Sequence, residues 1–202
     1  MTTLKTQRSP QQFTNELRGL EHVDWPSVWS GPPGHGQALD DWCTLLGWKA
    51  VPSERTLSVE TATGQRMALY PVVGGGWAPV ASLSWTTWHL RADDPAENET
   101  VLERSAEMWT AYEAAARSVL GEPQFSGAWD DPAFPEPPSE SHWLMPRELR
   151  LENQSPYRLA IWPASGPEGR TTVLWVNLGL APLAGEKRGA LVKIDCYPPE
   201  AM

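Results

Sequence analysis

The spacing of hydrophobic positions changes several times along the chain, and each change predicts a different element. Apolar residues recur three and four positions apart over 36–48, which predicts an amphipathic helix, and a shorter helix is predicted over 9–20. The clearest helix is expected over 95–120, where Asp94 has the character of an N-cap and Gly121 that of a C-terminal stop. These three segments carry the helical content that we expect.

Alternating apolar and polar positions predict strands before the long helix, and β-branched and aromatic residues predict strands after it. They fall at 55–60, 65–70, 80–90, 143–152, 157–162, 171–178 and 190–197. Helices interspersed with runs of strands predict an α+β fold, in which an antiparallel β-sheet, or more than one, has helices packed on one face.

We expect a single domain over 1–202, with an N-terminal helix and connector over 1–35. The order of elements also suggests two pseudo-repeated helix-plus-meander halves, 36–92 and 93–197. In this hypothesis LDDWCTLLGW of the first half corresponds to YEAAARSVLGEP of the second.

Charge is concentrated in one part of the sequence. The chain of 202 residues has a formal net charge of −9, and the segment 96–150 alone holds 11 acidic and 4 basic residues, which is −7. Such a segment repels a phosphate backbone, so we expect no nucleic-acid partner. A basic protein partner is its natural complement. The alternative is that acidity serves only solubility.

The acidic segment contains the residues that we expect to bind such a partner. Three glutamates are spaced four apart on the long helix, and SGAWDDPAFPEPPSE (126–140) combines aromatic residues, carboxylates and prolines. The predicted partner-binding residues are Glu99, Glu103, Glu107, Trp129, Asp130, Asp131 and Phe134. Three alternatives stay open: a solvated helix face for the glutamates, a turn-forming role for the aspartates, and a structural wrap that the aromatic residues pin to the core.

Twelve tryptophans suggest a different kind of site, in an enzyme or a small-ligand-binding protein. The residues that could line such a pocket are Trp85, Trp88, His89, Trp162 and Trp175. A deep cavity that holds His89 beside a carboxylate would favour this hypothesis. A third hypothesis is a structural protein that associates with itself.

No motif in the sequence predicts a catalytic residue, a cofactor or a metal site. The four histidines lack the spacing of zinc ligands, and the glycine-rich segments lack the lysine of a phosphate-binding loop. Cys43 and Cys196 lie in apolar surroundings and are expected to be reduced thiols of the core. Neither a signal peptide nor a membrane-spanning run is evident, so a cytoplasmic protein without membrane partners is expected.

One family resemblance bears on these alternatives. The segment GEPQFSGAWDDPAFPEPP, followed by the predicted strand YRLAIW, resembles small acidic actinobacterial proteins of the polymorphic-toxin immunity type over roughly residues 110–165. The resemblance implies no catalytic residues. It implies a non-enzymatic protein that masks a basic surface of a toxin or another protein partner.

Overall fold

The structure, a computed structural model, describes residues 2–51, 57–72, 76–136, 145–165, 168–178 and 187–199. The strands of these residues are β1 (Thr3–Gln7), β2 (Trp48–Val51), β3 (Leu57–Thr61), β4 (Arg66–Pro71), β5 (Val80–Arg91), β6 (Phe125–Ala128), β7 (Arg158–Trp162), β8 (Thr171–Leu178) and β9 (Gly189–Tyr197). The helices are α1 (Pro10–Gly19), α2 (Trp25–Ser30), α3 (Gln37–Leu45), α4 (Asn98–Leu120) and α5 (Arg147–Asn153), with a short 3₁₀ helix, η1 (Pro95–Glu97).

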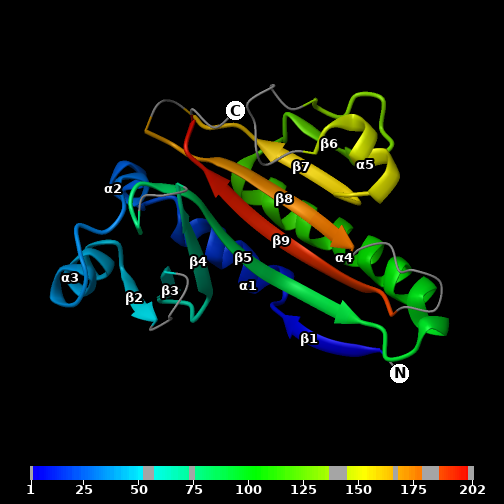
Figure 1. The fold of residues 1–202 in the computed structure, drawn as a ribbon, viewed down its shortest axis with the longest axis horizontal. Coiled ribbons are helices and arrows are strands. Elements are labelled where there is room, and N and C mark those ends of the chain that lie inside the picture. The colour runs from blue at the N-terminus through cyan, green and yellow to red at the C-terminus, as the bar shows by residue number, and fades with distance from the viewer. Residues whose placement is uncertain are drawn as a thin grey trace.

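All nine described strands join one antiparallel sheet, in the order β2-β3-β4-β5-β9-β8-β7-β6, and β1 pairs with β5 beside this path (Figure 1). The predicted α+β fold is therefore confirmed. The long strand β5 pairs with β4 near its start and with β1 near its end. Its other side pairs with β9 and so connects the two parts of the sheet.

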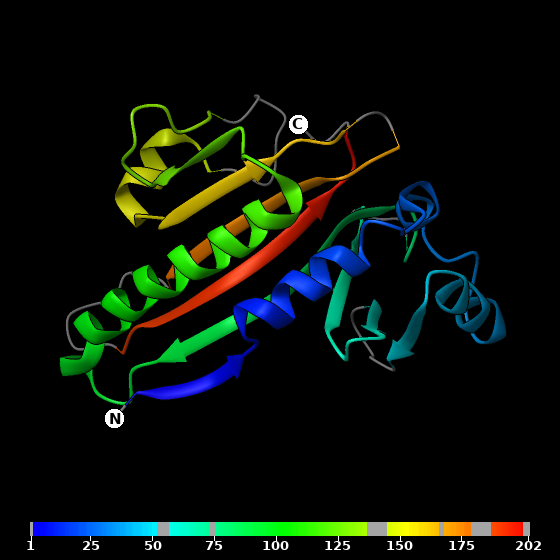
Figure 2. The ribbon, with the colours of Figure 1, turned by 180° about the vertical axis from the view of Figure 1, so that it is seen from behind.

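Helices α1 and α4 lie side by side on one face of the sheet (Figure 2). The rings of Phe13 and Tyr112 meet edge to face between them, with centroids 5.4 Å apart. The main hydrophobic core lies between these helices and the sheet, and it extends from Phe13 to Cys196. Large buried rings account for much of the apolar area removed from water in this core.

The opposite face of the sheet carries a second, smaller core. Leu159 and Ala160 are neighbours on β7, so their side chains point to opposite faces. Ala160 packs in the main core, whereas Leu159 packs with Phe134 and Trp175 in the second core. The segment that follows β6, together with α5, therefore covers the β6–β8 end of this face.

Helix α4 forms where its local sequence predicts it. Asp94 accepts a hydrogen bond from the backbone of Ala96, and the Glu97 side chain accepts one from the backbone of Asp94, which together form a capping box. Gly121 follows the last helical residue at φ +78°, a conformation that favours glycine. The start and the end of this helix are thus encoded by residues beside them.

A register shift in the second half of strand β5 changes which side chains share a face. Its pairing register with β9 shifts between Thr86 and Trp88. Trp85 and Trp88, which strict alternation would place on opposite faces, therefore both lie in the main core.

Several elements differ from the sequence prediction. The segment 147–153 is helix α5 rather than part of a strand over 143–152, and residues 143–144 lie outside the described residues. Arg147, Glu148 and Leu149 favour a helix, and the segment contains no β-branched residue that would favour a strand. The predictions also missed β1, α2, β2 and β6, all of which are short.

The two predicted halves each contribute four consecutive antiparallel strands to the sheet, β2–β5 and β6–β9. Their last strands, β5 and β9, pair with each other at the centre. The helix that packs beside α4 is α1 rather than α3, because α3 lies against β2 near the far edge of the sheet (Figure 1). An origin by duplication stays a prediction.

Candidate functional site

Three glutamates of α4 form an exposed row, here called the acidic ridge: Glu99, Glu103 and Glu107. The other side of the same helix buries Val101 and Tyr112 against the sheet, so the ridge faces solvent. Glu107 forms an ion pair with Arg104 at 2.8 Å, and both side chains are about 60% exposed. Among the described residues, no ion pair involves Glu99 or Glu103.

The aromatic, acidic segment after β6 is anchored to the second core. Phe134 is 4% exposed, and its ring meets Phe125 edge to face with centroids 5.3 Å apart. Asp131 accepts a hydrogen bond from the backbone of Ala133 at 2.8 Å, which is the turn-forming role. The prediction that Phe134 is a partner-contact residue is corrected by its burial. Phe134 instead pins the segment to the second core, which was the structural alternative.

A buried arginine, which the sequence analysis missed, contacts the same segment at several points. Arg150 of α5 is 2% exposed, and its guanidinium lies 4.0 Å from the centre of the Phe134 ring. It also forms an ion pair with Glu136 at 2.9 Å and donates a hydrogen bond to the carbonyl of Trp129. The composition of the segment does not indicate these contacts, because Arg150 lies at least 14 positions further along the chain. Residues 137–140 of the predicted stretch lie outside the described residues.

The predicted partner-binding residues do not form one surface. The acidic ridge belongs to α4, on the face of the sheet that holds the main core. The segment with Trp129, Asp130 and Asp131 follows β6 and is anchored by Phe134 on the other face. Asp130 is exposed, and Trp129 is partly exposed. The sheet therefore separates the two groups that the linear sequence placed near each other.

The tryptophan-lined pocket is likewise not assembled as predicted. Trp85, Trp88 and Trp162 are buried in the main core, and the Trp162 indole donates a hydrogen bond to the carbonyl of Gly121 at 2.8 Å. Trp175 lies on the opposite face of the sheet. These three core tryptophans supply packing rather than a binding site.

His89 is partly exposed, and its surroundings differ from those of a catalytic base. Burial lowers the pKa of His89, and the positive charges of Lys5 and Arg91 lower it further. The charged groups that act on His89 are thus Lys5 and Arg91, two cations, whereas the enzyme hypothesis required a carboxylate beside it.

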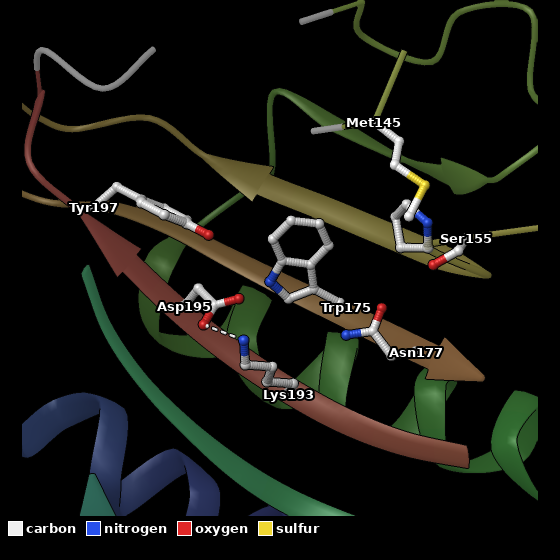
Figure 3. Close-up of a pocket in the computed structure, with 8 residues that line it drawn as sticks. Met145, Ser155, Trp175, Asn177, Lys193, Asp195 and Tyr197 are labelled. Atoms are coloured by element: carbon white, nitrogen blue, oxygen red, sulfur yellow. Dashed lines mark ion pairs between the residues drawn. The ribbon is translucent and has the colours of Figure 1, made fainter. Parts of the chain in front are cut away.

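A cavity of about 220 Å³ opens on the sheet face opposite α1 and α4 (Figure 3). Eight residues of β8, β9 and the segments beside α5 line it: Met145, Ser155, Pro156, Trp175, Asn177, Lys193, Asp195 and Tyr197. Of the predicted pocket residues, Trp175 alone appears among them. The alternation of β8 and β9 places the polar side chains of both strands in this cavity, but only strand pairing brings them together.

An ion pair lies in this cavity. Lys193 Nζ is 3.0 Å from Asp195 Oδ1, and the Asp195 side chain is 3% exposed. Burial raises the pKa of Asp195, while the positive charge of Lys193, followed by contacts with Ser84 and Trp175, acts in the opposite direction. Burial, followed by the nearby negative charge of Asp195, also raises the pKa of Tyr197. The pair thus places one positive and one negative group close together in a cavity that the rings of Trp175 and Tyr197 also line.

A second buried carboxyl lies far from this cavity, between α1, α4 and β5. Glu16 is 5% exposed, and its Oε1 atom is 3.4 Å from Nε of Arg8. Burial raises its pKa to about 7, although Arg8 and a weak contact from the Trp85 indole lower it. Tyr112 donates its hydroxyl hydrogen bond to the carbonyl of Arg8 beside this group. Because this cluster lies inside the main core, we expect the protonation of Glu16 to affect the free energy of unfolding.

The two cysteines are free and buried, as the sequence predicted. Burial raises the pKa of each thiol to about 11, which leaves Cys43 and Cys196 protonated near neutral pH. In the described part of the chain, no three His, Cys, Asp or Glu side chains gather as ligands for a metal ion. No helix within the described ranges has both the length and the hydrophobicity to cross a bilayer.

Comparison with models of protein families, with curated proteins and with solved structures finds no match for this chain.

Proposed function

We propose that the protein is a non-enzymatic binding protein that docks a basic protein partner on the acidic ridge of α4. The observation that carries this proposal is the exposure of Glu99, Glu103 and Glu107 on a helix whose other side is buried. Like charges four residues apart destabilise a helix by a few tenths of a kcal/mol per pair. A basic partner would remove that repulsion on binding.

Electrostatic complementarity suits this role because it speeds encounter and disfavours wrong partners. The ridge has Arg104 as its one cation among the helix residues 98–107, and that arginine is paired with Glu107. Asp93 and Asp94, just before η1, are both exposed and extend the negative region beyond the start of α4. These groups would face a positively charged surface.

The resemblance to immunity proteins of polymorphic toxins supports a toxin as the partner. A protein of this class acts by covering the working surface of a toxin, and a cleft that binds nucleic acid is basic. The ridge would block such a cleft by occupying it with carboxylates. We therefore propose inhibition by masking, without any chemical step.

The partner is to be identified by comparative capture from the native host. Wild-type protein and the double variant Glu103→Lys/Glu107→Lys serve as baits, and the captured proteins are identified by mass spectrometry. We expect a basic protein that the wild type retains at low salt and loses at high salt, and that the variant does not retain. Equal capture by both baits would contradict the proposal.

Association kinetics with the identified partner test the ridge itself. Charge reversal at Glu103 and Glu107 should slow association about tenfold at low ionic strength, because steering depends on the summed field. The matched control is Glu148→Lys/Glu152→Lys, which makes the same change of charge at two exposed positions of α5. An equal effect of both double variants would indicate net charge alone, and no effect of either would reject the ridge.

A further inference from the structure

The cavity that Trp175 and Lys193 line lies on the face of the sheet opposite α4, away from the acidic ridge. We propose that this cavity binds a small, planar, uncharged ligand that carries a carboxamide group. The proposal does not depend on the function assigned to the ridge, since it uses other residues on another face.

The balance of charge inside the cavity favours an uncharged ligand. Lys193 and Asp195 neutralise each other at 3.0 Å, and the Asp195 side chain is 3% exposed. A ligand with a net charge would have to give up its hydration without a free counter-ion, which is costly. A dipolar group avoids that cost and can still interact with both members of the pair.

The polar groups of the lining favour a carboxamide in particular. Within the described residues, the side chains of Asn177 and Ser155 have no hydrogen-bond partner, and an ammonium such as that of Lys193 has three donors, of which Asp195 takes one. The Asn177 carboxamide offers one donor group and one acceptor side by side. A ligand carboxamide can pair with it through two hydrogen bonds.

The walls and the size of the cavity favour a single ring. Trp175 and Tyr197 contribute aromatic rings, which Figure 3 shows, and Met145 and Pro156 contribute apolar surface to the lining. A volume of about 220 Å³ is below the range of drug-sized pockets, so one ring with one substituent suits it. Stacking on an aromatic wall would add to the burial of the ring.

Three probes of similar size test the proposal: benzamide, benzoate and benzylamine, which differ in charge and polar group. Each is titrated into ¹⁵N-labelled full-length protein, and the indole N–H signals of the tryptophans are recorded. The Trp175→Phe variant identifies the Trp175 signal. We expect benzamide to shift that signal and to bind at least tenfold more tightly than benzoate or benzylamine.

The role of Asn177 is tested by Asn177→Leu, which should weaken benzamide binding about tenfold because two hydrogen bonds are lost. Asn177→Asp keeps the shape and the acceptor but removes the donor group, so it should still lose one of the two hydrogen bonds if leucine disturbs the sheet. Glu103→Lys on the ridge is the control and should leave benzamide affinity unchanged. The proposal is overturned if no probe shifts the Trp175 signal, if a charged probe binds as tightly as benzamide, or if both Asn177 variants retain affinity.

Discussion

Glu16 shows how burial of a single carboxyl determines a property of the folded protein. Its pKa is raised to about 7 because the desolvation of the charge outweighs the attraction of Arg8, 3.4 Å away. The folded state therefore holds a proton between about pH 4.5 and 7 that the unfolded chain has already released. Stability from this group is fully present below pH 4.5 and is lost as the pH rises through 7.

The pH dependence of unfolding should reflect this residue. A rise in pKa from 4.5 to about 7 corresponds to roughly 3 kcal/mol at most, so the wild-type free energy of unfolding should fall by up to that amount across this range. Glu16→Gln should flatten the profile. Urea denaturation at several pH values from 4.5 to 8 measures it.

The control for this measurement is Glu21→Gln, the same change at an exposed position just beyond α1. It should leave the wild-type slope intact. A Glu16→Gln profile as steep as that of the wild type would show that other groups, such as Asp195, account for the pH dependence.

Tight packing around the connection after α2 is an element-scale feature. Gly31 ends α2 at φ +78°, and a Cβ atom there would lie 2.8 Å from the Cβ atom of Ala78 and 3.0 Å from its Cα atom. The segment before β5 thus passes directly against this turn. Glycine is required here both by the backbone conformation and by the close approach.

Gly31→Ala should therefore destabilise the protein by about 3 kcal/mol, because it combines backbone strain with a steric clash. Gly47→Ala is the matched control: Gly47 follows α3 at φ +71° but has nothing within 4 Å of the added Cβ atom. It should cost only about 1 kcal/mol. Chemical denaturation compares the two, and equal losses would contradict the proposed contact with Ala78.

The elements also differ in how far local sequence predicts them. Helix α4 is predictable because Asp94, Pro95 and Gly121 mark its ends and its buried stripe runs from Val101 to Ala116. Helix α5 has only seven residues, and its orientation depends on the burial of Arg150 against Phe134. A short segment contains too few periods to separate a helix from a strand, so its contacts decide.

The whole molecule is held together by one sheet and one main core. Strands β5 and β9 pair antiparallel at the centre, and the main core includes side chains from Phe13 to Cys196. The last strand of each predicted half, 36–92 and 93–197, is thus hydrogen-bonded to the last strand of the other half. Separating them would expose the edges of β5 and β9 to water.

Unfolding should consequently be a single cooperative transition rather than the successive loss of two halves. Urea denaturation followed by tryptophan fluorescence and by far-ultraviolet circular dichroism should give coincident curves. Ile194→Ala, which removes a fully buried side chain of β9, should shift both curves to lower urea by the same amount. Curves that separate, or two steps, would show that the halves fold independently.

The sequence by itself determined the features that depend on near neighbours. The period of apolar residues and the capping residues specify α4, and β-branched and aromatic residues specify strands such as 171–178, which the structure reproduces as β8. The same local information showed that the segment 96–150 is acidic and that Glu99, Glu103 and Glu107 share one side of a helix.

Tertiary structure alone decided which of these residues meet. The irregularity in β5 places Trp85 and Trp88 in one core, and the sheet separates the acidic ridge from the segment that Phe134 anchors. Strand pairing likewise brings Asn177 of β8 near Lys193 of β9 to form the cavity. Such contacts arise between residues far apart in the chain, where burial and strand register, rather than local preference, determine the free energy.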